Sequence, residues 1–300
     1  MRFVALVNGA AGSVSDDVVS QIEDALAAAG AEVAVRTVEP ADLAGAVRAA
    51  WRDHRPTAVL VAGGDGTVSS AAAAAAGTEV VLGVLPLGTF NHFARDLGMS
   101  VDLGIAAREL VEGAVRAVDV GEVNGRVFVN NSVLGLYPDL VSVRDELRER
   151  RGWGKVRAVP VAAARILRRF TVHRLDLDGP GVHRAKVRTP LVFVGNGRFD
   201  TGGLGLPDRR GSALGDGVLD VVVARDVSRW GLVRTAARAL FGREGGPGGD
   251  LDRAEVTELS VGSRARQVRV ALDGEVVDLA TPLRYRVRPG ELRVLAPFAP

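Results

Sequence analysis

The stretch AVLVAGGDGT, residues 58–67, decides the fold class of this chain. Its first five residues form a continuous apolar run, which is typical of a strand buried on both faces of a sheet. The turn Gly63–Thr67 follows, and then small residues from Val68 to about Ala76 predict a helix. A strand, a glycine-rich turn and a helix in immediate succession indicate a βαβ unit.

The segments on either side of this unit repeat the alternation of strands and helices. Apolar runs and stretches with helical spacing alternate at Phe3–Val7, Val14–Ala29, Val33–Val38, Ala41–Trp51 and Val80–Leu85. We therefore expect residues 1–120 to form an α/β domain around a parallel sheet.

The pattern changes after about residue 115, where short strand-like stretches replace the alternation. Asn124-Gly125 separates two of these stretches and is a strong signal for a β-hairpin. A helical insertion is expected over about 138–170, and further short strands follow. Many short strands separated by turns predict an antiparallel β-sandwich domain over residues 121–289.

Composition excludes several classes of protein. The chain has 300 residues, no cysteine and a formal net charge of +2. Without cysteine there are no disulfide scaffolds, thiolate zinc sites, iron–sulfur clusters or cysteine nucleophiles. The apolar runs are too short or too rich in alanine for a membrane span, and the N-terminus resembles a strand rather than a signal peptide, so we expect a cytoplasmic protein.

The net charge conceals an asymmetry between the two halves. Residues 1–120 hold 8 basic and 15 acidic residues, whereas residues 121–300 hold 30 basic and 21 acidic residues. Such polarity suggests two parts with different partners, although scattered surface arginines would produce it as well.

The turn Gly63–Thr67 has the composition of a phosphate-binding loop. Glycines let backbone N–H groups approach an anion closely, and the following helix directs the positive end of its dipole at the turn. No lysine follows, since Lys155 and Lys186 are the only lysines of the chain. Backbone amides, hydroxyls, arginine or a metal must therefore stabilise the negative charge of the phosphate. Because Asp65 would repel a polyphosphate unless a cation lay between them, it indicates Mg²⁺. A purely structural turn is the alternative.

A second polar turn, Pro86–Asn91, follows the next predicted strand. In a doubly wound sheet both turns open at the carboxyl edge, where ligands bind. Thr89 and Asn91 would then face the same cleft as Asp65 and Thr67. Two such turns predict a ligand site more strongly than one.

A third motif, Asp273-Gly274-Glu275, lies between strand-like runs late in the chain. It is interpreted either as a tight turn or as a general base with a second charge for a metal or nucleotide.

Together these motifs resemble the diacylglycerol kinase catalytic-domain superfamily, and more narrowly the bacterial soluble lipid kinases related to sphingosine kinases. The resemblance rests on GGDGT at Gly63–Thr67, PLGTFNHFARDLG at Pro86–Gly98, DGVLD at Asp216–Asp220 and DGE at Asp273–Glu275. It implies a phosphofructokinase-like nucleotide domain, a C-terminal β-sandwich, an active site in the cleft between them, and a tail of about residues 290–300 that returns to the first domain. It also implies transfer of the γ-phosphoryl of ATP to a lipid hydroxyl, such as that of diacylglycerol, with Mg²⁺.

The resemblance assigns roles to single residues as well. Asp273 would be the general base that takes the proton of the lipid hydroxyl, and Glu275 would act on the nucleotide side. The residues expected at the nucleotide are Asn8, Thr37, Gly63, Gly64, Asp65, Gly66, Thr67, Gly88, Thr89 and Asn91. Asp216, with the backbone carbonyls of Ala213 and Val218, matches a structural metal site.

Two departures from the family pattern leave alternatives open. His92 stands where many members have aspartate, and Asn8-Gly9 stands where the family more often has Asn-Pro. Because His92 departs from the family pattern, a non-catalytic nucleotide- or lipid-binding regulator stays an alternative. An NAD kinase would share the GGDGT turn, but the PLGTFN segment and the late Asp-Gly-Glu favour the lipid kinase.

The segment Arg148–Arg174 carries nine basic residues and one acid, Glu149. Its apolar residues recur at helical spacing, and Trp153 lies near one end, a pattern that indicates a helix docking on a membrane surface. The alternative is a helix whose apolar stripe packs on its own domain. No nucleic-acid motif accompanies the charge, so we expect no nucleic-acid partner.

Overall fold

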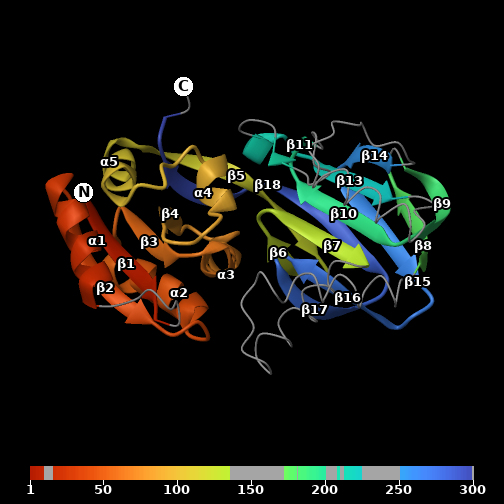
Figure 1. Ribbon diagram of the computed structural model, residues 1–300, viewed down its shortest axis with the longest axis horizontal. Coiled ribbons are helices and arrows are strands. Elements are labelled where there is room, and N and C mark those ends of the chain that lie inside the picture. Colours follow the sequence, from red (N-terminus) through yellow and green to blue (C-terminus); the bar gives the residue numbers. More distant parts are fainter. Residues whose placement is uncertain are drawn as a thin grey trace, which may run out of the picture.

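The computed structural model describes residues 1–9, 16–135, 172–180, 182–200, 208–209, 213–224 and 251–298 (Figure 1). Within these ranges, α-helices gather in the N-terminal lobe, and the C-terminal lobe consists mainly of strands (Figure 1). Among the described residues, no helix is long and apolar enough to cross a membrane.

The N-terminal lobe alternates strands and helices, which confirms the predicted α/β class. Its elements are β1 (Arg2–Asn8), α1 (Asp16–Ala28), β2 (Glu32–Val38), α2 (Leu43–His54), β3 (Ala58–Gly63), α3 (Asp65–Ala75), β4 (Val81–Pro86), α4 (His92–Asp96) and α5 (Leu103–Glu112). The strands pair in parallel in the order β2-β1-β3-β4. Helix α1 contacts α5, and α2 contacts α3, so the two faces of the sheet are covered by different pairs (Figure 1). Every residue of β3 and β4 is buried, as continuous apolar runs predict.

Two long strands connect the lobes. β5 (Ala114–Val123) pairs antiparallel with β18 (Leu283–Ala296) along nearly its whole length, and Arg293 and Val294 of β18 also pair in parallel with β4. The end of the chain therefore adds a strand to the N-terminal sheet. The expected domain boundary at residue 120 falls inside β5.

The C-terminal lobe is an antiparallel β-sandwich, as predicted. Its further elements are β6 (Arg126–Phe128), β7 (Asn131–Gly135), β8 (His173–Gly179), β9 (Val182–Thr189), β10 (Leu191–Asn196), β11 (Phe199–Asp200), β12 (Asp208–Arg209), the 3₁₀ turn η1 (Ala213–Gly215), β13 (Leu219–Ala224), β14 (Leu251–Val256), β15 (Glu258–Ser263), β16 (Gln267–Leu272) and β17 (Glu275–Ala280). One sheet has the order β14-β13-β10-β7-β16-β17, and β15, β8 and β9 extend the sheet that contains β18. Buried apolar side chains of both sheets, such as Leu134, Val270 and Leu175, form one core.

The helical insertion expected over about 138–170 lies outside the described residues. The same holds for the segment Arg148–Arg174 except its end, where His173 and Arg174 begin β8.

Candidate active site

The two glycine turns meet at the carboxyl edge of the parallel sheet. β3 and β4 are neighbours, and Gly63 lies opposite Pro86 in their register. The turn backbones touch, since a Cβ built on Gly88 would lie 2.6 Å from the Cα of Gly64. Only glycine at position 88 permits this approach, so the sequence folds both turns into one cradle.

The first turn leads directly into α3, which begins at Asp65. Its N-cap is Gly64, and no side chain caps the helix by a hydrogen bond. The first N–H groups of a helix have no partner within the helix. They are therefore available to an anion at the cradle, where the helix dipole favours negative charge. A nucleotide phosphate fits these residues.

Asp65 holds the second turn in place. Its Oδ1 accepts from the His92 backbone N–H at 2.7 Å, and its Oδ2 accepts from that of Asn91 at 3.1 Å. These two amides stabilise part of the negative charge of the Asp65 carboxylate, for which the sequence predicts a bound cation. Each carboxylate oxygen keeps a second acceptor position, which fits a Mg²⁺ ion held by a carboxylate together with phosphate oxygens.

Asn91 shapes the cradle through its side chain. The residue is 6% exposed and adopts the left-handed conformation, with φ of 54°. Its Oδ1 accepts from the Gly88 N–H at 2.9 Å, and its Nδ2 donates to the Gly88 carbonyl at 2.8 Å. Thr89 is exposed beside it, and the ring of Phe90 stacks on His92 with centroids 5.6 Å apart.

The remaining residues expected at the nucleotide lie at the same sheet edge. Asn8 ends β1, and its Nδ2 donates to the Thr67 Oγ1 at 2.8 Å. Thr37 is exposed near the end of β2, with its methyl group against Gly9. The structure thus brings Asn8, Thr37 and both turns to one edge, as parallel strands require.

Asp273 lies between β16 and β17 with φ of 47°. Its Oδ2 accepts from the Val129 N–H at 2.9 Å and from the Ser69 hydroxyl at 2.5 Å. Its Oδ1 accepts from the N–H groups of Asn130 and Asn131 at 2.8 and 3.0 Å. Because Ser69 belongs to α3, this contact joins the third motif to the helix that starts at the first.

Sequence reasoning missed Ser69 and the three amides of residues 129–131. Ser69 stands in a helix of small residues and carries no motif signal of its own. The amides of Val129 and Asn130 belong to the turn between β6 and β7, and that of Asn131 begins β7, far from Asp273 in the sequence.

Two opposing effects act on the pKa of Asp273. Burial raises the pKa of its carboxyl group above the ordinary value, while the hydrogen bonds from Ser69 and the three amides act to lower it. Glu275 begins β17 and is exposed. Among the described residues, no hydrogen bond or ion pair joins Glu275 to either glycine turn.

The metal site expected in the C-terminal lobe stays a prediction. The Asp216 Oδ2 lies 3.6 Å from the Arg198 Nη1, and the Val218 carbonyl accepts from the Gly197 N–H at 2.9 Å, while Ala213 begins η1. Within the described ranges, no group of three or more His, Cys, Asp or Glu side chains could hold a metal. The Asp216 carboxylate faces the Arg198 guanidinium, which would compete with a cation for it.

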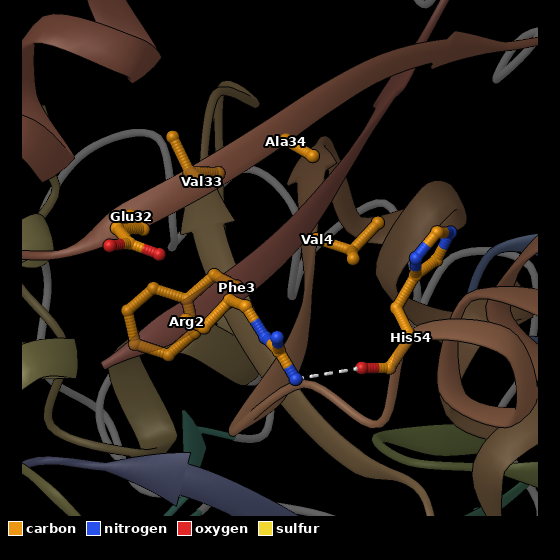
Figure 2. Close-up of a pocket in the computed structure, with 7 residues that line it drawn as sticks. All are labelled: Arg2, Phe3, Val4, Glu32, Val33, Ala34 and His54. Carbon is orange, nitrogen blue, oxygen red and sulfur yellow. Dashed lines mark hydrogen bonds between the residues drawn. The ribbon is translucent and has the colours of Figure 1, made fainter.

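A separate pocket lies at the opposite edge of the N-terminal sheet. Its volume is about 230 Å³, and Figure 2 shows its lining: Arg2, Phe3, Val4, Glu32, Val33, Ala34 and His54. Arg2 donates to the His54 carbonyl at 3.1 Å across one side of it (Figure 2). Because β1 runs from Arg2 toward Asn8, this pocket is remote from the glycine turns.

Comparisons with known proteins identify the family of this chain. The diacylglycerol kinase catalytic domain matches residues 2–123, and the YegS C-terminal NAD kinase beta sandwich-like domain matches residues 145–296. A probable lipid kinase YegS-like of Pseudomonas aeruginosa is 34% identical over 90% of this chain and 86% of the relative. A diacylglycerol kinase of Mycobacterium tuberculosis is 32% identical over 80% and 77% of the two chains.

The fold is shared with a solved structure as well. The crystal structure of a diacylglycerol kinase from Bacillus anthracis matches with a TM-score of 0.69 at 20% identity, covering 98% of this chain and 96% of that one. The two family models match the N-terminal and the C-terminal lobe in turn. This chain belongs to the diacylglycerol kinase catalytic-domain family of lipid kinases.

Proposed function

We propose that this protein transfers the γ-phosphoryl group of ATP to the hydroxyl group of a lipid such as diacylglycerol, with Asp273 as the general base. The observation that carries the proposal is the contact between Ser69 and Asp273, because it sets a candidate base beside the helix whose N-terminus forms the phosphate cradle. Family membership supports phosphoryl transfer to a lipid.

The N-terminal lobe would hold the nucleotide. Gly63–Thr67 and Gly88 would surround the phosphates with backbone N–H groups, and Asn8 and Thr37 would border them. Asp65 would hold Mg²⁺, which when bound neutralises charge on the phosphate oxygens. Positioning and charge stabilisation are the main requirements of phosphoryl transfer.

The C-terminal lobe would supply the base. The lipid hydroxyl oxygen forms a bond to the γ-phosphorus, the bond from that phosphorus to the β,γ-bridging oxygen breaks, and ADP leaves with the electron pair. Asp273 accepts the hydroxyl proton. Glu275 is exposed, and the family resemblance implies that it acts on the nucleotide side.

We also propose that the enzyme works at a membrane surface, where its acceptor resides. The basic segment Arg148–Arg174 would attract an anionic leaflet, at about 1 kcal/mol for each basic residue close to it. The segment lies outside the described residues, so this proposal rests on its sequence.

The proposal is tested by incubating the pure protein with ATP labelled in the γ-phosphate and a total lipid extract, then identifying the labelled product. We expect the label in the lipid phase. A parallel reaction offers NAD, because the matched C-terminal domain is NAD kinase-like. Labelled NADP without labelled lipid would favour an NAD kinase, and nucleotide binding without any transfer would favour a regulator.

The rate should also depend on pH in a defined direction. A general base works only when ionised, and burial raises the pKa of Asp273. Activity is therefore present at high pH and lost as the pH falls through that pKa. The acid limb of kcat/KM should lie above the ordinary aspartate value of about 3.9. A limb at or below that value would remove Asp273 from the base role.

A further inference from the structure

The acceptor capacity of the Asp273 carboxylate is fully used by the protein itself. An ionised carboxylate offers about four lone-pair positions on its two oxygens. The N–H groups of Asn130 and Asn131 occupy Oδ1, and the Val129 N–H and the Ser69 hydroxyl occupy Oδ2. A lipid hydroxyl that transfers its proton to this carboxylate must first displace one of these donors.

Three of the four donors are held by the backbone. Val129, Asn130 and Asn131 lie where β6 passes into β7, and the Asp273 N–H donates in return to the Asn131 carbonyl at 2.9 Å. The pairing of β7 with β16, in which Ser132 lies opposite Leu272, holds Asn131, and the carbonyls of Asn130 and Val129 accept from Asn196. The backbone donors therefore stay in place when a substrate binds.

The fourth donor is the only one on a rotatable side chain. Ser69 is half-buried in the first half of α3, and rotation about its Cα–Cβ bond frees Oδ2 without moving the helix. A helical serine has an alternative partner in the backbone carbonyl four residues earlier, which here is that of Asp65. Displacement of the Ser69 hydroxyl therefore leaves no buried donor without a partner.

We propose that the Ser69 hydroxyl reserves the acceptor position on Asp273 for the lipid hydroxyl and keeps water from it until the lipid binds. The inference rests on the proposed function, because it assigns Ser69 a role through the base. Ser69 is a positioning residue in this account.

The consequence appears in the choice between two acceptors. A water molecule seated on Asp273 Oδ2 could attack the γ-phosphorus, give its proton to the carboxylate and release ADP and inorganic phosphate. The serine hydroxyl stands in that place while no lipid is bound. Without it, hydrolysis of ATP should rise relative to transfer.

The test compares Ser69→Ala with the wild type in two assays, ATP hydrolysis without lipid and transfer to lipid. Alanine is a better helix former than serine, so α3 should keep its structure, and thermal unfolding checks this. We expect the ratio of hydrolysis to transfer to rise about ten- to hundredfold, the equilibrium weight of one hydrogen bond to a charged acceptor. In the wild type the hydrogen bond from Ser69 lowers the pKa of Asp273. Its removal should therefore raise this pKa and move the acid limb of kcat/KM to higher pH.

Two variants make the comparison specific. Ser70→Ala makes the same chemical change at the next, exposed position of α3 and should leave both readouts at wild-type values. Ser69→Thr keeps a hydroxyl and should restore the wild-type ratio. If Ser69→Ala shows the same ratio and pH limb as Ser70→Ala, the role of Ser69 is wrong although lipid transfer stands. If the folded wild type hydrolyses ATP but phosphorylates no lipid, the proposed function itself fails.

Discussion

Replacing Asp273 with asparagine should lower lipid phosphorylation by about a hundred- to ten-thousand-fold, the usual contribution of a general base. Asparagine keeps the shape of the side chain but cannot take the proton of the acceptor hydroxyl. The nucleotide cradle contains no atom of Asp273, so the affinity for ATP should change little. The loss should therefore appear in kcat, measured by transfer from labelled ATP at saturating nucleotide.

The variant should stay folded. Its amide NH₂ group can donate one hydrogen to Ser69, whose hydroxyl can rotate to accept, so that the Val129 N–H and the second hydrogen of the amide lose an acceptor. Each buried N–H without a partner costs about 1–3 kcal/mol, so the variant should unfold at a lower temperature but stay folded if the domain has a stability of about 5–15 kcal/mol. Circular dichroism and thermal unfolding would check this.

Asp278→Asn is the matched control for this variant. Asp278 lies on β17, the same strand that follows Asp273, but its side chain is exposed and 3.9 Å from the Arg269 guanidinium. The same chemical change there should leave transfer unaffected. Equal rates for Asp273→Asn and Asp278→Asn would contradict the assignment of Asp273.

Replacing Gly88 with alanine should weaken nucleotide binding, because the added Cβ forces the two turns apart. The new Cβ would lie 2.6 Å from the Cα of Gly64 and 2.7 Å from the Asn91 Oδ1, and neither can yield cheaply because both belong to the bonded framework of the cradle. Overpacking of this kind costs about 1–3 kcal/mol. We expect a loss of about tenfold or more in ATP affinity by titration calorimetry, since 1.4 kcal/mol is tenfold.

Gly45→Ala is the control for the steric argument. Gly45 lies on the exposed side of α2, where a Cβ would meet no atom within 4 Å. Alanine there should raise the free energy of unfolding by about 1 kcal/mol and leave ATP affinity unchanged. Unchanged ATP affinity in Gly88→Ala would show that the packed turns are not the nucleotide cradle.

Much of the fold and half of the site follow from local sequence signals. The apolar runs around Gly63–Thr67 and Pro86–Asn91 predict neighbouring parallel strands, and parallel strands bring their following turns together. That reasoning needs only order and spacing. The partners of Asp65 and Asn91 were not predictable in the same way, because turn geometry directs their side chains to backbone groups.

The other half of the site depends on tertiary structure. Ser69 and Asp273 are separated by 204 residues, and the pairing of β18 with β4 and β5, together with that of β5 with β6, brings the lobes together so that α3 contacts β6. No periodicity in the sequence encodes a contact between a helix of small residues and a turn between two late strands. The family resemblance supplied the role of Asp273, while its hydrogen bonds came from the structure.

The most direct test of the account is the fate of the γ-phosphate in a reaction containing the wild type or Asp273→Asn, lipid and ATP labelled in either the γ- or the α-phosphate. The account predicts that the wild type moves label into lipid from the γ-position only, and that Asp273→Asn, with wild-type ATP affinity, moves almost none. Lipid labelled equally by both proteins, or no labelled lipid from a folded wild type that binds ATP, would contradict it.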